Sequence, residues 1–159
     1  MRVQNISTNL SKSNSSTTDI FMNNDLILDL DGICDNLISL VVLRLSCKNL
    51  KSLKYLPKEL PNLTQISLNC PELKSLENFP QSLPKLRNLD ISSEKLESLK
   101  KLPKKLPNLN YINLKCPELK TLEYFSHNLP KLGRLEIRSE KLESLEYLPP
   151  HLTCLESLN

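Results

Sequence analysis

Three acidic side chains stand close together in the segment LILDLDGICDN, which occupies positions 26–36. Two of them, Asp29 and Asp31, have the spacing of the first two oxygen ligands in a calcium-binding loop. The fifth position of that loop would be Ile33, and its twelfth would be Leu40, where a bidentate glutamate is required. Neither of these side chains carries an oxygen, so the segment does not predict a calcium site.

The same segment resembles the first motif of the haloacid-dehalogenase phosphatases, in which a hydrophobic strand delivers Asp-x-Asp-Gly to a phosphoryl group. The resemblance implies that Asp29 is a nucleophile and Asp31 a general acid. A phosphatase of that family also needs a downstream lysine motif and a paired acidic motif, and no Asp-Asp pair occurs in the chain. A 23-residue repeat that runs through the segment leaves Asp29, Asp31 and Asp35 between buried positions, facing water. We therefore expect no catalytic residues and no enzymatic activity.

Zinc would need thiol or imidazole ligands, and the chain has five cysteines and two histidines. Cys47, Cys70 and Cys116 share one position of the repeat, without CxxC spacing and without histidine partners. His127 and His151 fall in loops on the other side of the repeat. A Gly-rich phosphate loop is also missing from the sequence. We expect no metal and no cofactor, and we interpret the cysteines as small core or turn residues.

The elements that would position any functional side chain come from an internal repeat of 23 residues. Leucine and isoleucine recur at this interval without an insertion, and the unit reads L-x-x-L-x-L-x-C/S-x-x-L-x-x-L-x-x-L/F-P-x-x-L-P. Two dissimilar units alternate, because NCPELKSLENF matches KCPELKTLEYF 46 residues later. The first three columns are Leu40, Leu63, Leu86, Leu109, Leu132 and Leu155; Leu43, Ile66, Leu89, Ile112 and Leu135; and Leu45, Leu68, Ile91, Leu114 and Ile137.

Each unit predicts a short parallel strand followed by a tight return. The last two leucines of L-x-x-L-x-L have the period of two that a strand with one buried face shows. Leucines then recur every three residues, as in the column Leu53, Leu76, Leu99, Leu122 and Leu145, and two columns of proline exclude long α-helices there. The frame extends backward to Ile20 and Met22, which we expect to point inward from a first strand.

This pattern resembles the leucine-rich repeat family over roughly residues 17–159, and most closely its short intracellular class, which includes phosphatase-regulatory subunits. The resemblance implies a horseshoe solenoid with short parallel strands on the concave face and 3-10 or extended turns on the convex face. The asparagine column of the family is replaced by Lys48, Pro71, Glu94, Pro117 and Glu140. We hypothesise that the preceding Cys/Ser column bonds the buried carbonyls of the turn instead.

The domain organisation follows from the same frame. Residues 1–16 are rich in Ser, Thr and Asn, and we expect them to form a disordered tail. The solenoid then has an irregular first unit at 17–39, full units from 40, and a last unit truncated at 155–159. An open parallel edge at that end would invite self-association, and a fragment of a longer repeat protein or a decaying gene copy are the alternatives.

Strand residues that point away from the core line the concave face, which repeat proteins use for recognition. Tyr and Arg are enriched at binding hot spots, and they gather in the C-terminal half of this face. The predicted partner-binding residues are Arg44, Asp90, Tyr111, Lys115, Arg134, Glu136 and Arg138. The family resemblance implies non-catalytic recognition of another protein. The alternative is a substrate-receptor or regulatory fragment of a larger complex, such as a ubiquitin ligase or a phosphatase.

Charged residues outside the strands fall into two groups. Glu72, Lys95, Glu118 and Lys141 alternate in sign along one column, and Lys74, Glu97, Lys120 and Glu143 alternate in the opposite phase. We interpret both columns as ion pairs between neighbouring units. Lys100, Lys101, Lys104 and Lys105, in LKKLPKKLP, instead form a basic patch on the convex side. A contact with an anion or with RNA through this patch is a second alternative function.

The overall charge and hydropathy limit the partners. A net charge of +3 is too small to favour nucleic acid by itself. No stretch approaches the roughly 18 apolar residues of a membrane-spanning helix, and the N-terminal residues have no apolar signal-peptide core. We expect no membrane partner and a cytoplasmic location, with a nuclear location also compatible.

Overall fold

The structure is a computed structural model that describes residues 19–26, 30–31, 37–149 and 157–158. The predicted tail at 1–16, the acidic residues Asp29 and Asp35, His151 and the start of the last unit at 155–156 lie outside these ranges. Of the acidic segment, Leu30 is fully buried and Asp31 is exposed in a turn, as the repeat predicts. Across the described residues, no helix is long and apolar enough to cross a membrane.

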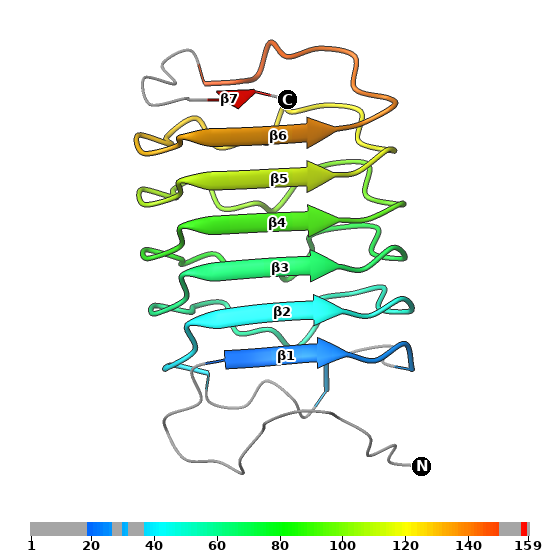
Figure 1. The fold of residues 1–159 in the computed structure, drawn as a ribbon, viewed down its shortest axis with the longest axis vertical. Helices are drawn as coiled ribbons and strands as arrows, with labels where there is room; N and C mark the ends of the chain where they lie inside the picture. Colours follow the sequence, from blue (N-terminus) through cyan, green and yellow to red (C-terminus); the bar gives the residue numbers. More distant parts are fainter. Residues whose placement is uncertain (1–18, 27–29, 32–36, 150–156, 159) are drawn as a thin grey trace.

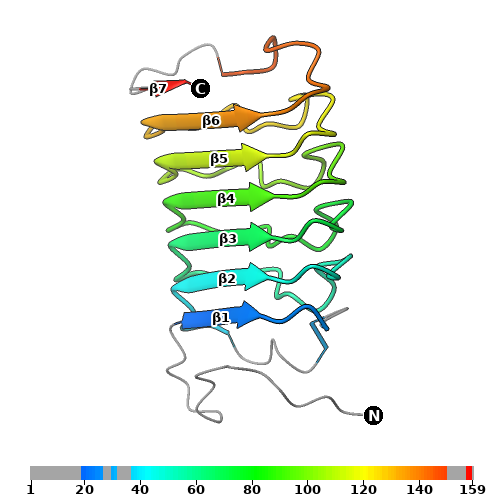
Figure 2. The same cartoon turned by 45° about the vertical axis from the view of Figure 1, so that its right-hand side comes forward.

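Seven parallel strands form one sheet in which each strand pairs with the next strand of the chain. They are β1 (Asp19–Asn23), β2 (Val42–Ser46), β3 (Gln65–Asn69), β4 (Asn88–Ser92), β5 (Tyr111–Lys115), β6 (Arg134–Arg138) and β7 (Ser157–Leu158). Each paired residue lies beside the residue 23 positions later, for example Phe21 beside Arg44. The chain therefore climbs by one strand per repeat, as Figure 1 and Figure 2 show, and the predicted parallel-strand solenoid is confirmed. We call the 23 residues from the start of one strand to the start of the next a coil.

Alternation of apolar and polar residues explains why these segments form strands with one buried face. In β2, Leu43 and Leu45 point into the core, whereas Arg44 between them is exposed. In β1, Ile20 and Met22 are buried in the same way, so the extension of the repeat into the first unit is confirmed. Leucines of the return segments fill the space behind the sheet and complete one continuous core.

One predicted core position is wrong. Leu53, Leu76, Leu99 and Leu122 are fully buried, but Leu145 in the same column is 50% exposed. In a solenoid, the side chains of each coil are covered by the coils on both sides. Among the residues that the structure describes, no further return segment follows the one that contains Leu145, so one side of this leucine stays uncovered.

In the β2, β3 and β5 coils, the chain returns to the next strand through three tight turns. In the coil of β2, backbone hydrogen bonds close these turns over three residues each, from Leu50 to Cys47, from Leu56 to Leu53 and from Leu63 to Leu60. Extended segments with proline connect the second turn to the third. The described part of the chain contains no 3-10 helix, so of the two predicted forms of the return only single turns with extended connections are seen.

The Cys/Ser column ties each coil to the preceding one. The hydroxyl of Ser93 donates to the carbonyl of Leu73 at 2.6 Å, and that of Ser139 donates to the carbonyl of Leu119 at 2.7 Å. The alternating coils have cysteine here, and the thiol of Cys70 lies 3.8 Å from a buried strand carbonyl. The hypothesis that the Cys/Ser column bonds buried carbonyls of the turn is confirmed for both serines.

The charged columns next to this turn form ion pairs between coils. Lys95 lies 2.7 Å from Glu72, and Lys141 lies 2.6 Å from Glu118. In the second column, Lys120 lies 2.6 Å from Glu97, and this contact lowers the pKa of the Glu97 carboxyl. The predicted pairing is therefore confirmed for these three pairs. Such exposed pairs contribute little to stability, and they explain these charges without a ligand.

Candidate functional site

The candidate site is the outer face of the sheet, which we define as the strand residues that alternate with the buried ones. From β1 to β6 these are Asp19, Phe21, Asn23, Val42, Arg44, Ser46, Gln65, Ser67, Asn69, Asn88, Asp90, Ser92, Tyr111, Asn113, Lys115, Arg134, Glu136 and Arg138. The face carries four basic and three acidic side chains. All seven residues that the sequence analysis proposed for partner binding lie on it.

A cluster around Glu136 occupies the C-terminal end of the outer face. The Glu136 side chain is only 9% exposed, although it lies on the face that points away from the core. Arg134 Nη2 lies 2.6 Å from Glu136 Oε1, and Arg138 Nη2 lies 4.0 Å from Oε2. The close contact orients Arg134, whereas Arg138 stands at a looser ion-pair distance, and both arginine side chains stay more than half exposed.

Tyr111 completes this cluster from the neighbouring strand. Its hydroxyl donates to Glu136 Oε1 at 3.4 Å, and the Arg134 guanidinium lies 5.6 Å from the centre of its ring. Burial, and then the Glu136 carboxylate, raise the pKa of the Tyr111 hydroxyl, so the phenol stays protonated and remains a donor at neutral pH. The ring and the stacked guanidinium together form a rigid anchor of the type found at binding hot spots.

A polar row continues from this cluster into the middle of the sheet. Asn113 is 4% exposed, and its amide Nδ2 donates to Asp90 Oδ1 at 3.0 Å. Its other polar atom, Oδ1, accepts no hydrogen bond from any residue that the structure describes. Burial raises the pKa of the Asp90 carboxyl, whereas Lys115 and the Asn113 amide oppose this shift. A buried amide and a half-buried carboxylate therefore lie side by side on the outer face of the sheet, not in the leucine core.

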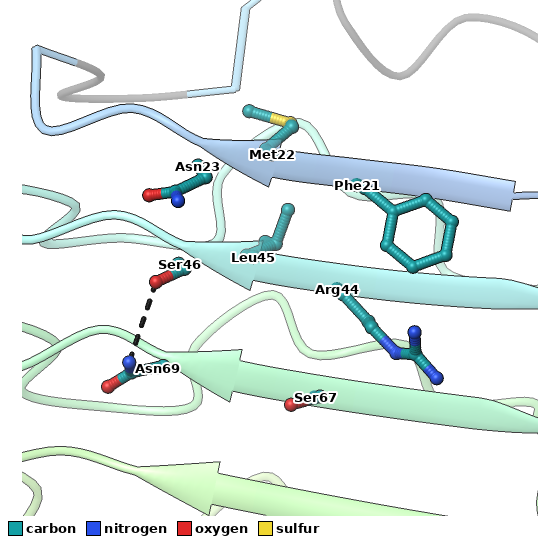
Figure 3. Close-up of a pocket in the computed structure, with 8 residues that line it drawn as sticks. All are labelled: Phe21, Met22, Asn23, Arg44, Leu45, Ser46, Ser67 and Asn69. Carbon is teal, nitrogen blue, oxygen red and sulfur yellow. Dashed lines mark hydrogen bonds between the residues drawn. The ribbon is translucent and has the colours of Figure 1, made fainter. Parts of the chain in front are cut away.

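A second aromatic–arginine pair lies at the N-terminal end of the face. The Arg44 guanidinium is 4.9 Å from the centre of the Phe21 ring, and Arg44 also donates to Gln65 Oε1 at 3.0 Å. Figure 3 shows the ring and the guanidinium side by side on β1 and β2, with Asn69 bonded to Ser46 nearby. These residues border a hollow of about 380 Å³, which is wide enough for a partner side chain.

The basic patch has a different place in the fold. Lys101, Lys104 and Lys105 line one hollow with Tyr124 on the turn side of the solenoid, but Lys100 does not belong to its lining. The structure thus brings three of the four predicted lysines together, away from the outer face of the sheet.

Metal and thiol chemistry find no support in the described residues. No group of three or more His, Cys, Asp or Glu side chains there could hold a metal ion. Cys47, Cys70 and Cys116 are free and completely buried, as predicted for core positions. Burial raises the pKa of Cys70 and of Cys116 to about 11, so both thiols stay protonated and unreactive at neutral pH.

No protein-family model, curated protein or solved structure matches this chain. The functional interpretation therefore rests on the geometry of its own residues.

Phe21 and Asn113 are the site residues that the sequence analysis missed. Phe21 stands 23 positions before Arg44 and lies between the inward-pointing Ile20 and Met22, so the repeat frame alone could have placed it on the outer face. The burial of Asn113 has no such signal, because the repeat frame places it among the outward-pointing strand positions.

Proposed function

We propose that this chain is a leucine-rich-repeat module that recognises another protein through the outer face of its sheet, without catalysing a reaction. In this interpretation the outer face is the concave side of a horseshoe. The 23-residue frame, the parallel strands and the leucine core support the assignment to this type of repeat.

The two aromatic–arginine pairs at opposite ends of the outer face carry this proposal. Phe21 is 47% exposed, although an aromatic ring of that size gains free energy when it is buried. The two pairs are four strands apart in the sheet, which corresponds to about 19 Å at about 4.8 Å per strand. Between them the face is mostly small and polar. A partner that spans the sheet would fill both anchors and leave a polar rim, which is the usual anatomy of an interface.

The proposal is tested by quantitative affinity capture from lysate of the source cells with four versions of the tagged chain. Two variants remove one anchor each, Phe21→Ala/Arg44→Ala and Tyr111→Ala/Arg134→Ala. The matched control is Lys54→Ala/Tyr55→Ala, because Lys54 lies 4.8 Å from the Tyr55 ring and forms the same kind of pair on the turn side. Thermal unfolding of each variant checks that it remains folded.

We expect a protein that the native chain and the control retain equally, and that both anchor variants lose by at least about tenfold. That protein is then purified and its affinity measured directly with the same four versions. Equal retention by all four versions would show that the outer face is not the working surface.

A further inference from the structure

A second surface feature lies on the turn side, where the return segments of the β4 and β5 coils meet. It is a hollow of about 840 Å³, a volume within the usual range for small-molecule sites. We name it the basic hollow, and its lining includes Lys101, Leu102, Lys104, Lys105, Tyr124 and His127. It shares no residue with the outer face of the sheet.

An interruption of the repeat accompanies the basic hollow. Pro57, Pro80, Pro103 and Pro149 share one column, and the coil of β5 has Ser126 at this position instead. The Ser126 hydroxyl donates to the carbonyl of Lys104 at 2.7 Å, so the serine fixes the backbone of the lysine segment. The structure thus ties the two lysines of this segment to the neighbouring coil.

The backbone beside the hollow is held from the other side as well. Lys101 has a positive φ of 78°, whereas Tyr124, at the equivalent position of the next coil, does not. The Gln81 side chain donates to the carbonyl of Lys101 at 2.8 Å and to that of Phe79 at 2.8 Å. The lining therefore contains two equivalent turns with different backbone conformations. Side chains of the two neighbouring coils, Gln81 and Ser126, bond the backbone of the lysine segment.

The positive charge of the hollow is less fully compensated than that of the lysines in the charged columns. Lys95, Lys120 and Lys141 each have a carboxylate within 2.7 Å. Lys101 lies 3.7 Å from Glu77, and Glu123 belongs to the lining, whereas within the described residues Lys104 and Lys105 form no ion pair. The equivalent positions of the β2 coil hold Lys58 and Glu59, whose charges cancel, so the two adjacent lysines are a departure from the repeat.

The rest of the lining combines polar residues, among them Glu123 and His127, with an apolar and aromatic part. Leu102 and Phe125 are buried at its floor, and Tyr124 is 39% exposed. Ammonium groups beside an exposed aromatic ring are the combination with which proteins bind a phosphate and stack the base attached to it. A bare phosphate would need the lysines alone, and the apolar floor would have no role.

We propose that the basic hollow binds a nucleotide, with its phosphate on Lys104 and Lys105 and its base against Tyr124. A free nucleotide and a unit of single-stranded RNA offer this same chemistry, and experiment distinguishes them. The site is independent of protein recognition by the outer face, so the two proposals fail or succeed separately.

Fluorescence anisotropy with a labelled eight-nucleotide oligouridylate tests the assignment on the full chain. Lys104→Gln/Lys105→Gln removes the phosphate contacts, and Tyr124→Leu removes the ring while it keeps an apolar side chain. Lys100→Gln is the matched control, because Lys100 belongs to the same basic run but lies outside the hollow. Thermal unfolding confirms that each variant is folded, and unlabelled uridine monophosphate and inorganic phosphate serve as competitors.

We expect the double lysine variant to weaken binding by at least about tenfold and Tyr124→Leu by about fivefold or more, with Lys100→Gln within about twofold. Competition by uridine monophosphate at concentrations where inorganic phosphate has no effect indicates a free nucleotide, and competition by unlabelled oligouridylate alone indicates RNA. No binding, an equal loss in Lys100→Gln, or equal competition by inorganic phosphate would each overturn the proposal.

Discussion

Two of the three carboxylates on the outer face are shielded from water, because Glu136 is buried and Asp90 is half-buried, whereas Asp19 is exposed. Glu136 is covered by its own arginine neighbours and by Tyr111, and both guanidinium groups compensate its charge. Asp90 has a weaker set of partners, because Lys115 only moderates the effect of burial and Asn113 supplies a single amide donor. Burial of a charge without full compensation costs free energy, so the ionised Asp90 carboxylate destabilises the folded state.

The first prediction concerns Asp90→Asn and its dependence on pH. Burial raises the pKa of Asp90 in the folded state above its ordinary value of 3.8. The folded state therefore binds the proton more tightly than the unfolded state, and the stability contribution of this group is present at low pH and is lost as pH rises through the folded pKa. We expect Asp90→Asn to be more stable than the native chain at about pH 7, with the difference vanishing toward about pH 4. Thermal unfolding across that range measures it.

Glu97→Gln provides the opposite control for this prediction. The hydrogen bond from Lys120 lowers the pKa of Glu97 below its ordinary value, so its contribution is present above that value and is lost as pH falls. The native chain should therefore exceed Glu97→Gln in stability at neutral pH and approach it in acid. If Asp90→Asn showed the same trend as Glu97→Gln, burial would not be the dominant influence on Asp90.

At the scale of elements, the second turn of the β2, β3 and β4 coils carries conformational strain without glycine. Tyr55, Asn78 and Lys101 have positive φ values of 76°, 65° and 78°, a region that other residues than glycine adopt at a cost. In the 23-residue sequence unit these positions fall between two apolar residues, and nothing in the sequence distinguishes them from other exposed positions. The turn persists because the flanking leucines are buried and the hydrogen bond over three residues closes it.

The second prediction uses two adjacent lysines of one such turn. Lys101→Gly should stabilise the chain by about 0.5–1 kcal/mol. Glycine removes the steric cost of the left-handed backbone in the folded state. The greater conformational entropy of glycine in the unfolded state offsets only part of this gain. Lys100→Gly, one residue earlier and with an ordinary φ, should destabilise by about 0.5–1 kcal/mol, because only the entropic effect remains. Chemical denaturation measures both. A loss of stability in both variants would contradict the left-handed conformation of Lys101.

The strands and their register could be predicted from the sequence, whereas the turns could not. Leucines at an unbroken spacing of 23 residues specify which residues lie side by side, so Tyr111 beside Arg134 followed from counting. The sign of φ at Lys101 depends on the packing of leucines on both sides of the turn, and no glycine marks it. The basic hollow was beyond prediction for a similar reason, because it combines a turn that changes between two coils with a single serine in a proline column.

At the scale of the whole molecule, the two proposed binding surfaces lie on different sides of the solenoid. The sheet presents the aromatic–arginine pairs, and the return segments present the basic hollow, so a partner on one side leaves the other accessible. Contacts connect each strand only with its neighbours in the stack, from β1·β2 to β6·β7. Stability in such an array is close to a sum of interfaces between neighbouring coils, and the coils at the ends have fewer of them.

The third prediction compares one repeat position in the centre and near the end of this array. Leu99 is fully buried and Leu145 is 50% exposed, although both belong to the same column. Leu99→Ala should reduce the free energy of unfolding by about 2–5 kcal/mol, because a cavity forms between packed coils. Leu145→Ala should cost less than about 1 kcal/mol, because little apolar surface is lost there. Equal losses, measured by chemical denaturation, would mean that another part of the assembly covers Leu145, and a search for a copy or a segment that packs on this end would follow.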